Sequence, residues 1–158
     1  MEGGSGREPG RADRWEELSR ILSGVRKLPL PEKTHFYGGV VYLCGTLLPW
    51  DVLAGAPALE VGGWSYGVGT DLAHFLVLGG LLLQGFHLAG KGPGLDRGVL
   101  GIYRFAYLWV LLVVTMRVLA QFQGGLGLWL TFLGAGVQAW ALYRLCKDAG
   151  LLPGGGPS

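Results

Sequence analysis

The sequence predicts an all-α integral membrane protein: a four-transmembrane-helix bundle with a short extracellular β-hairpin and an N-terminal amphipathic helix. Three observations predict it. Half of the 158 residues are hydrophobic and 15% are charged, against about 25% charged in a typical soluble domain. Several long apolar segments follow one another, and every second segment that connects them has no lysine or arginine.

The N-terminal residues 1–33 predict a cytoplasmic arm. Within it an amphipathic helix is expected over residues 13–25, with Asp13 as the N-cap. The apolar face of this helix is expected either to lie on the membrane or a partner, or to pack on the inner end of the bundle. The residues of this face predicted to contact a partner are Trp15, Leu18 and Leu22.

The first predicted span covers residues 34–50. Pro29 and Pro31 before it predict a short stiff connector. The span is short, so Lys33 and Trp50 are expected to lie at the two membrane interfaces.

The loop of residues 51–68 is expected outside the membrane. Residues 58–61 and 64–66 predict two strands, and Gly62-Gly63 between them predicts a tight turn. An isolated hairpin is marginally stable, so it should rest on the mouth of the bundle or on another protein. The predicted partner surface is Leu59, Trp64 and Tyr66. The alternative is an aromatic belt at the headgroup level.

The other predicted spans are residues 69–89, 99–121 and 125–145. The 23 residues of 99–121 would extend roughly 34 Å as a helix, enough for a hydrocarbon core of about 30 Å. Together the four spans form one transmembrane domain over residues 34–150, and residues 151–158 predict a flexible tail.

Small residues recur at every fourth position of the last span and predict a surface where another helix approaches closely. They are Gly127, Thr131, Ala135 and Ala139. We expect this surface to pack inside the bundle. The alternative is a dimer face, in which case the protein would form a homo-oligomer.

The distribution of lysine and arginine predicts the orientation. Seven lie in the arm, two in the connector between the second and third spans and two at the end of the last span. The loop 51–68 and the turn before the last span have none. Positive residues stay on the cytoplasmic side, so both termini are predicted to be cytoplasmic.

Polar residues inside the second and third spans predict contacts at two depths. Folding these spans about their connector brings Asp71 level with Arg117, and Gln84 level with Arg104. Both pairs cannot face each other, because the 13 residues between the levels rotate a helix by about 220°. The outer pair is expected to form, with His74 on the same face as Asp71. This intramembrane polar cluster would be a proton or ion relay, or a structural ion pair, and its closeness to water favours the structural role.

His35 and His87 lie near the same end of the first two spans, so a haem ligated by both is a further interpretation. Ordinary interfacial histidines are favoured, because the sequence has no second pair. No cofactor is therefore expected.

The sequence does not predict a disulfide, a metal site, an enzyme or a nucleic-acid partner. Cys44 and Cys146 fall at different depths and have no histidine or cysteine at ligand spacing, so neither a disulfide nor a metal site is predicted. No GxSxG, HExxH or phosphate-binding glycine motif occurs, so no catalytic residue is assigned and an enzyme is not expected. A net charge of +2 does not indicate a nucleic-acid partner.

Two short motifs carry a resemblance. Leu47-Leu48-Pro49-Trp50 ends the first span and Gly63-Trp64 lies in the loop, an arrangement that resembles small uncharacterised bacterial four-helix membrane proteins. The topology is also similar to that of claudins, whose loop motif has cysteines that this loop lacks. The resemblance implies a multi-pass protein of a bacterial inner or plasma membrane and carries no known site to this chain.

The sequence therefore predicts a non-enzymatic structural or accessory subunit of a membrane protein complex. Its expected partners are membrane lipids and other integral membrane proteins, bound through the outer hairpin, the arm or the lipid-facing helix surfaces. The alternative is a small transporter or channel component that uses the Asp71, His74 and Arg117 cluster, and the third interpretation is a haem-bearing electron-transfer subunit.

Overall fold

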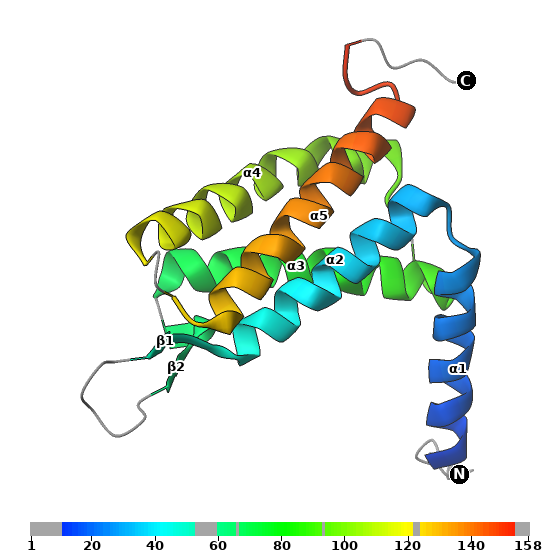
Figure 1. Cartoon of the computed structure of the whole chain (residues 1–158). Coiled ribbons are helices and arrows are strands. Elements are labelled where there is room, and N and C mark those ends of the chain that lie inside the picture. Colours follow the sequence, from blue (N-terminus) through cyan, green and yellow to red (C-terminus); the bar gives the residue numbers. More distant parts are fainter. Residues whose placement is uncertain (1–10, 53–59, 66, 93, 122–123, 154–158) are drawn as a thin grey trace, which may run out of the picture.

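Figure 1 shows a computed structural model of the chain, which is mostly helical. It describes residues 11–52, 60–65, 67–92, 94–121 and 124–153. The elements are α1 (Arg11–Lys27), α2 (Leu30–Leu47), β1 (Pro49–Val52), β2 (Glu60–Gly62), a 3-10 turn (Gly63–Ser65), α3 (Val68–Leu88), α4 (Arg97–Ala120) and α5 (Leu126–Asp148).

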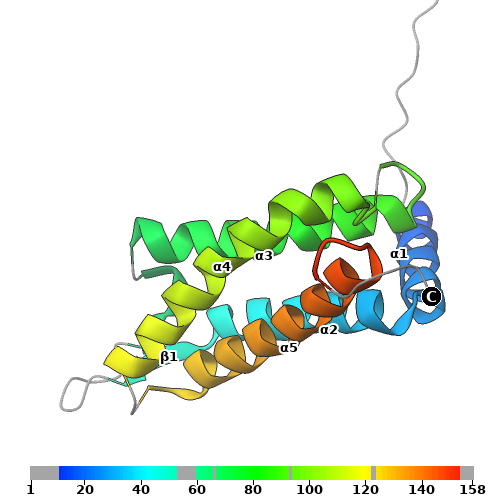
Figure 2. The ribbon, with the colours of Figure 1, turned by 90° about the horizontal axis from the view of Figure 1, so that it is seen from above.

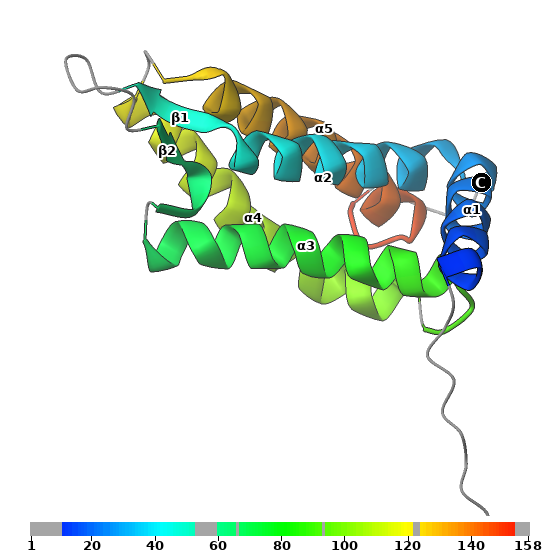
Figure 3. The ribbon, with the colours of Figure 1, turned by 90° about the horizontal axis from the view of Figure 1, so that it is seen from below.

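Helices α2 to α5 form a bundle, and α1 projects sideways from one end of it, with its last turns against α3. The first view and the view from below both show α1 roughly perpendicular to the long axis of the bundle (Figures 1 and 3). We call this the arm end; it also holds the α3–α4 connection and the last turns of α5. The other end, which we call the sheet end, holds β1, β2 and the start of α5.

Within the described residues, α3, α4 and α5 are long and apolar enough to cross a membrane. Many of their large apolar side chains are exposed, which suits a lipid environment. Examples are Leu72, Phe75, Leu82, Ile102, Leu112, Met116, Leu119, Phe132 and Leu133. The chain is therefore a multi-pass membrane protein.

Helix α2 is less apolar than these three, and its surroundings explain why. Its buried residues are His35, Gly38, Gly39, Tyr42, Gly45 and Thr46. These small and polar residues face the other helices. They lower the mean hydropathy of the helix, while Tyr37, Val40 and Leu47 on its other side are exposed.

The contact between α2 and α5 is the closest in the bundle, and the two helices run alongside each other in Figure 2. A side chain on Gly134 would meet the backbone nitrogen of Tyr42, and one on Gly45 would lie 2.5 Å from the backbone nitrogen of Thr131. Of the predicted small-residue stripe, Gly127 and Thr131 lie in this seam. Ala139 instead lines a groove between α5 and α4, since a four-residue spacing rotates about 40° per step.

The two strands differ from the predicted hairpin. β1 pairs antiparallel with β2, with Val52 opposite Glu60, so the predicted pairing of 58–61 with 64–66 is wrong. Gly62 and Gly63 make no primed turn, because neither has the positive φ that such a turn requires. Gly63 is small for another reason: a side chain there would lie 2.7 Å from the Trp50 ring.

Two expectations about the first span are also corrected. Trp50 is fully buried and donates from Nε1 to the Gly45 carbonyl, at 3.1 Å, so it is not an interfacial anchor. Helix α2 begins at Leu30, which puts Pro31 in its first turn. Proline fits there because the first amides of a helix have no partner in the helix.

Helix α1 begins at Arg11, so Asp13 lies inside the helix and is not its N-cap. Val25 is 1% exposed and Gly24 lies close to Leu88 of α3, so the last turns of α1 are held against the bundle. Trp15 and Leu22 are 66% and 63% exposed. The side chain of Leu18 lies outside the described residues.

Candidate functional site

His74 lies in the bundle interior and contacts α2 and the 3-10 turn. Its ring is fully buried, with Nδ1 2.9 Å from the Tyr42 hydroxyl and Nε2 3.2 Å from the Gly63 carbonyl oxygen. A carbonyl oxygen only accepts, so Nε2 carries the proton and Nδ1 accepts from Tyr42. The Trp64 ring centroid lies 4.7 Å from that of His74. His74 therefore hydrogen-bonds to neither Asp71 nor Arg117.

Arg117 contacts the neighbour of the predicted aspartate. Its Nη2 donates to the Thr70 hydroxyl at 3.4 Å, and no ion pair joins it to Asp71 among the described residues. Oδ1 of Asp71 is buried with no hydrogen-bond partner in that part of the chain. One residue rotates a helix by about 100°, which is enough to turn Thr70 rather than Asp71 toward α4.

Gln84 and Arg104 do not meet at the second predicted level. Gln84 donates from Nε2 to the Glu32 carbonyl at 3.3 Å, which fixes its amide so that Oε1 accepts from Nδ1 of His35 at 3.0 Å. Arg104 instead donates from Nη1 to the Leu151 carbonyl at 2.7 Å. Gln84 therefore contacts α2, whereas Arg104 contacts the segment that follows α5.

The two histidines considered as haem ligands have different surroundings. His35 is fully buried, and its ring lies edge-on to Tyr103 with centroids 5.6 Å apart. His87 is exposed, and its ring lies beside Gly94. Among the described residues no contact joins the two rings.

Further buried polar side chains lie between these levels. The Tyr107 hydroxyl lies 3.0 Å from the Ala135 carbonyl oxygen and 2.9 Å from Oε1 of Gln138. Nε2 of His35, Nε2 of Gln138 and the Tyr103 hydroxyl are buried without a hydrogen-bond partner in the described chain. We call the whole set the polar core: His35, Tyr42, His74, Gln84, Tyr103, Tyr107 and Gln138.

The polar core receives side chains from all four bundle helices, and the sequence interpretation missed four of its members. Tyr42, Tyr103, Tyr107 and Gln138 lie inside apolar segments, where composition alone does not distinguish them from other residues of a membrane span. One signal was available: Tyr103 and Tyr107 are four residues apart, which puts both hydroxyls on one face of α4.

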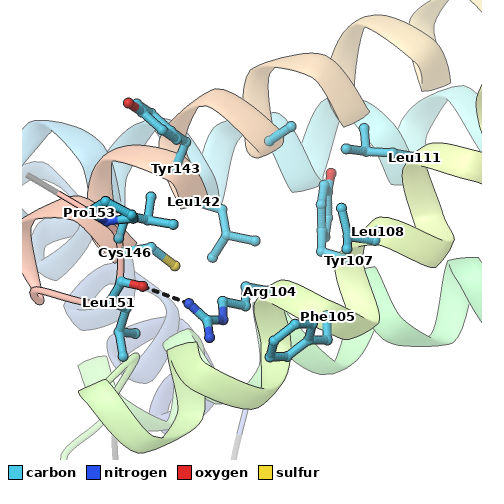
Figure 4. A pocket seen from close by; sticks show the side chains of 12 residues that line it. Arg104, Phe105, Tyr107, Leu108, Leu111, Leu142, Tyr143, Cys146, Leu151 and Pro153 are labelled. Atoms are coloured by element: carbon cyan, nitrogen blue, oxygen red, sulfur yellow. Dashed lines mark hydrogen bonds between the residues drawn. The ribbon is translucent and has the colours of Figure 1, made fainter.

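A groove of about 450 Å³ lies between α4 and α5 at the arm end (Figure 4). Figure 4 shows Arg104 between Leu151, to which it hydrogen-bonds, and Leu108 and Leu111. The guanidinium also lies 4.5 Å from the centre of the Phe105 ring. The groove is lined by Arg104, Phe105, Tyr107, Leu108, Leu111, Ala139, Leu142, Tyr143, Cys146, Leu151, Leu152 and Pro153.

The predicted partner surface is divided by the structure. Leu59 and Tyr66 lie outside the described residues. Trp64 is 38% exposed and donates from Nε1 to the Thr46 hydroxyl at 3.1 Å, so much of its ring packs on the bundle. Trp15 and Leu22 remain exposed on α1.

The described residues hold no group of three histidine, cysteine or acidic side chains suited to a metal ion. Cys44 is exposed and Cys146 is buried, and both are free thiols. Comparison of the chain with protein-family models, curated proteins and solved structures finds no match.

Proposed function

We propose that this multi-pass protein is a non-enzymatic accessory subunit of a membrane protein complex and that α1 is its main docking surface. It crosses a bacterial inner or plasma membrane four times, with both termini cytoplasmic and the strands β1 and β2 outside. Its partners are other integral membrane proteins.

The contacts of α2 support a fourth span. Its 18 residues extend about 27 Å, close to the thickness of a hydrocarbon core. It packs along α5, a helix that is apolar enough to cross a membrane. Glu32 and Lys33 lie in its first turn or next to it, where charged side chains can reach the headgroup region.

The charges at the two ends of the bundle support the orientation. Basic residues gather at the arm end: Arg26, Lys27, Lys33, Lys91, Arg97, Arg144 and Lys147. At the sheet end, the described residues include one basic side chain, that of Arg117. Positive residues are retained on the cytoplasmic side, so the arm end would be cytoplasmic.

The single observation that carries the docking proposal is the position of α1. It projects sideways from the arm end of the bundle, and Trp15 and Leu22 lie seven residues apart on one side of it, both more than 60% exposed. In the proposed orientation α1 lies along the membrane surface, where a neighbouring membrane protein can cover that side. Exposed tryptophan and leucine provide the kind of apolar contact on which interfaces depend.

Purification of the tagged chain in mild detergent from its source cells tests the proposal. A partner should be recovered at a fixed ratio by quantitative mass spectrometry, and Trp15→Ser with Leu22→Ser should reduce that ratio about tenfold. The matched control is Ile102→Ser with Leu119→Ser, on the exposed outer face of α4, which should leave the ratio unchanged. Recovery without any protein at a fixed ratio would contradict the subunit role, and an unaffected ratio would contradict docking through α1.

A transporter component is the second candidate, and the polar core favours it. Buried groups that can accept or donate protons extend from His35 near the arm end to His74 near the sheet end. Proton flux into liposomes that is lost in His35→Gln would support this function, with His87→Gln as the control. Liposomes as tight as empty ones would exclude it.

A further inference from the structure

The groove between α4 and α5 combines an apolar channel with a positive charge at one end. Arg104, Leu108 and Leu111 succeed one another along one side, and Cys146, Leu142 and Ala139 along the other. Residues 151–153 close it at the arm end. Its volume of about 450 Å³ falls within the roughly 300–1,000 Å³ of small-molecule sites.

Arg104 has hydrogen-bonding capacity left for a ligand. Its Nη1 donates to the Leu151 carbonyl and its Nε is buried, so Nη2 is the nitrogen that is accessible and without a partner among the described residues. None of the residues that line the groove is acidic. The positive charge of Arg104 is therefore uncompensated within the groove, and a guanidinium in an apolar setting favours an anion with oxygen acceptors.

The depth of Arg104 fits the headgroup region of a membrane. Arg104 follows Arg97, the first residue of α4, by seven positions, which is about 10 Å along the helix. The long side chain can reach further toward the membrane surface. From Arg104 the groove runs inward along Leu108 and Leu111, in the direction in which the acyl chain of a lipid extends.

Two other grooves lack this combination. One of about 640 Å³, between Thr34 and the exposed side of α5, is lined by no charged residue. Another of about 450 Å³ holds Arg117, which donates to Thr70 at the sheet end. The accessible Nη2 of Arg104 thus distinguishes the groove between α4 and α5 from these two.

We propose that this groove binds one membrane phospholipid with an anionic headgroup, its phosphate on the Arg104 guanidinium and an acyl chain along Leu108 and Leu111. Basic pockets between membrane helices are suited to such headgroups. The bound lipid would contact both α4 and α5, and this proposal does not depend on docking through α1.

Intact-protein mass spectrometry in detergent tests this proposal. The purified protein is titrated with phosphatidylglycerol and with phosphatidylcholine of the same acyl chains. We expect one phosphatidylglycerol to bind at least about tenfold more tightly than phosphatidylcholine, because both lipids carry a phosphate but the quaternary ammonium of choline repels the Arg104 guanidinium. Arg104→Gln should abolish that preference and Arg104→Lys should retain part of it.

Further variants test whether the preference for phosphatidylglycerol arises from the groove rather than from general surface charge or from misfolding. Arg144→Gln removes an arginine near the same end of α5 that stacks on Trp140 and does not line the groove. Ala139→Phe fills the groove and should reduce phosphatidylglycerol binding about tenfold, whereas Gly136→Phe, on the same helix outside it, should not. These two retain Arg104, so they test the site even if Arg104→Gln fails to fold.

Three results would overturn the proposal. Equal binding of the two phospholipids would show that the headgroup charge is not recognised. An equal loss in Arg104→Gln and Arg144→Gln would assign the preference to overall charge. Tighter binding of oleate than of phosphatidylglycerol would make a free fatty acid the occupant.

Discussion

The Tyr42 hydroxyl lies 2.9 Å from Nδ1 of His74 and ties α2 to α3 inside the bundle. The other ring nitrogen of His74 lies 3.2 Å from the Gly63 carbonyl oxygen, which brings in the 3-10 turn. One buried imidazole thus joins three segments that are distant in the sequence. This arrangement leaves both ring nitrogens occupied, which is typical of a residue with a structural role.

His74→Phe should destabilise the protein. The change leaves the Tyr42 hydroxyl and the Gly63 carbonyl buried without their partner, which costs about 1–3 kcal/mol in the free energy of unfolding. Urea unfolding in detergent, followed by circular dichroism, measures it. His87→Phe is the control and should change this free energy by less than about 0.5 kcal/mol, because His87 is exposed. Equal effects would contradict the buried hydrogen bonds.

Gly134→Ala should loosen the contact between α2 and α5. A Cβ at this position meets the backbone of Tyr42, so the two helices must separate, and overpacking of this kind costs about 1–3 kcal/mol. The comparison is Gly136→Ala, two residues further along α5, where a Cβ meets nothing within 4 Å. Alanine should be neutral there or stabilise the helix by up to about 1 kcal/mol. Melting temperatures in detergent distinguish the two variants, and a tolerant Gly134 would show that α2 and α5 lie further apart.

Val25→Ala should weaken the attachment of α1 to the bundle. Val25 is 1% exposed, and the loss of its two methyl groups lowers the stability of this contact by about 1–2 kcal/mol. Amide hydrogen exchange in residues 11–27 should then accelerate about tenfold. Leu22→Ala, on the exposed side, should leave the rates unchanged. The same rates in Val25→Ala and the unmodified chain would mean that α1 is not held by this contact.

The helices apolar enough to cross a membrane could be predicted closely because their residues carry a continuous signal. The predicted span 99–121 is α4, Arg97–Ala120 in the structure, and its earlier start has a local cause. The Asp96 side chain accepts from the Val99 backbone nitrogen at 2.8 Å and caps the helix. Charge and apolar length thus predict where these helices run.

The side-chain partners inside the bundle could not be predicted in the same way. Folding α3 against α4 gave the depth of Arg117 to within one residue, but its contact is Thr70 and not Asp71, because rotation about the helix axis decides which residue faces inward. Tyr42 meets His74 only because α2 also lies beside α3, and a single sequence does not state which helices are neighbours. Trp50 was expected at an interface for a similar reason, since burial under Gly63 depends on the strand pairing.

Whether α2 crosses the membrane is tested most directly by labelling intact cells with a membrane-impermeant maleimide. Single cysteines at Lys27, Lys91 and Leu126 are introduced into a chain with Cys44→Ser and Cys146→Ala; all three positions are exposed. With four spans, Leu126→Cys reacts in intact cells, while Lys27→Cys and Lys91→Cys react only after the cells are permeabilised. Reaction of Lys27→Cys together with Leu126→Cys, with Lys91→Cys still protected, would mean that three helices cross and that α2 does not.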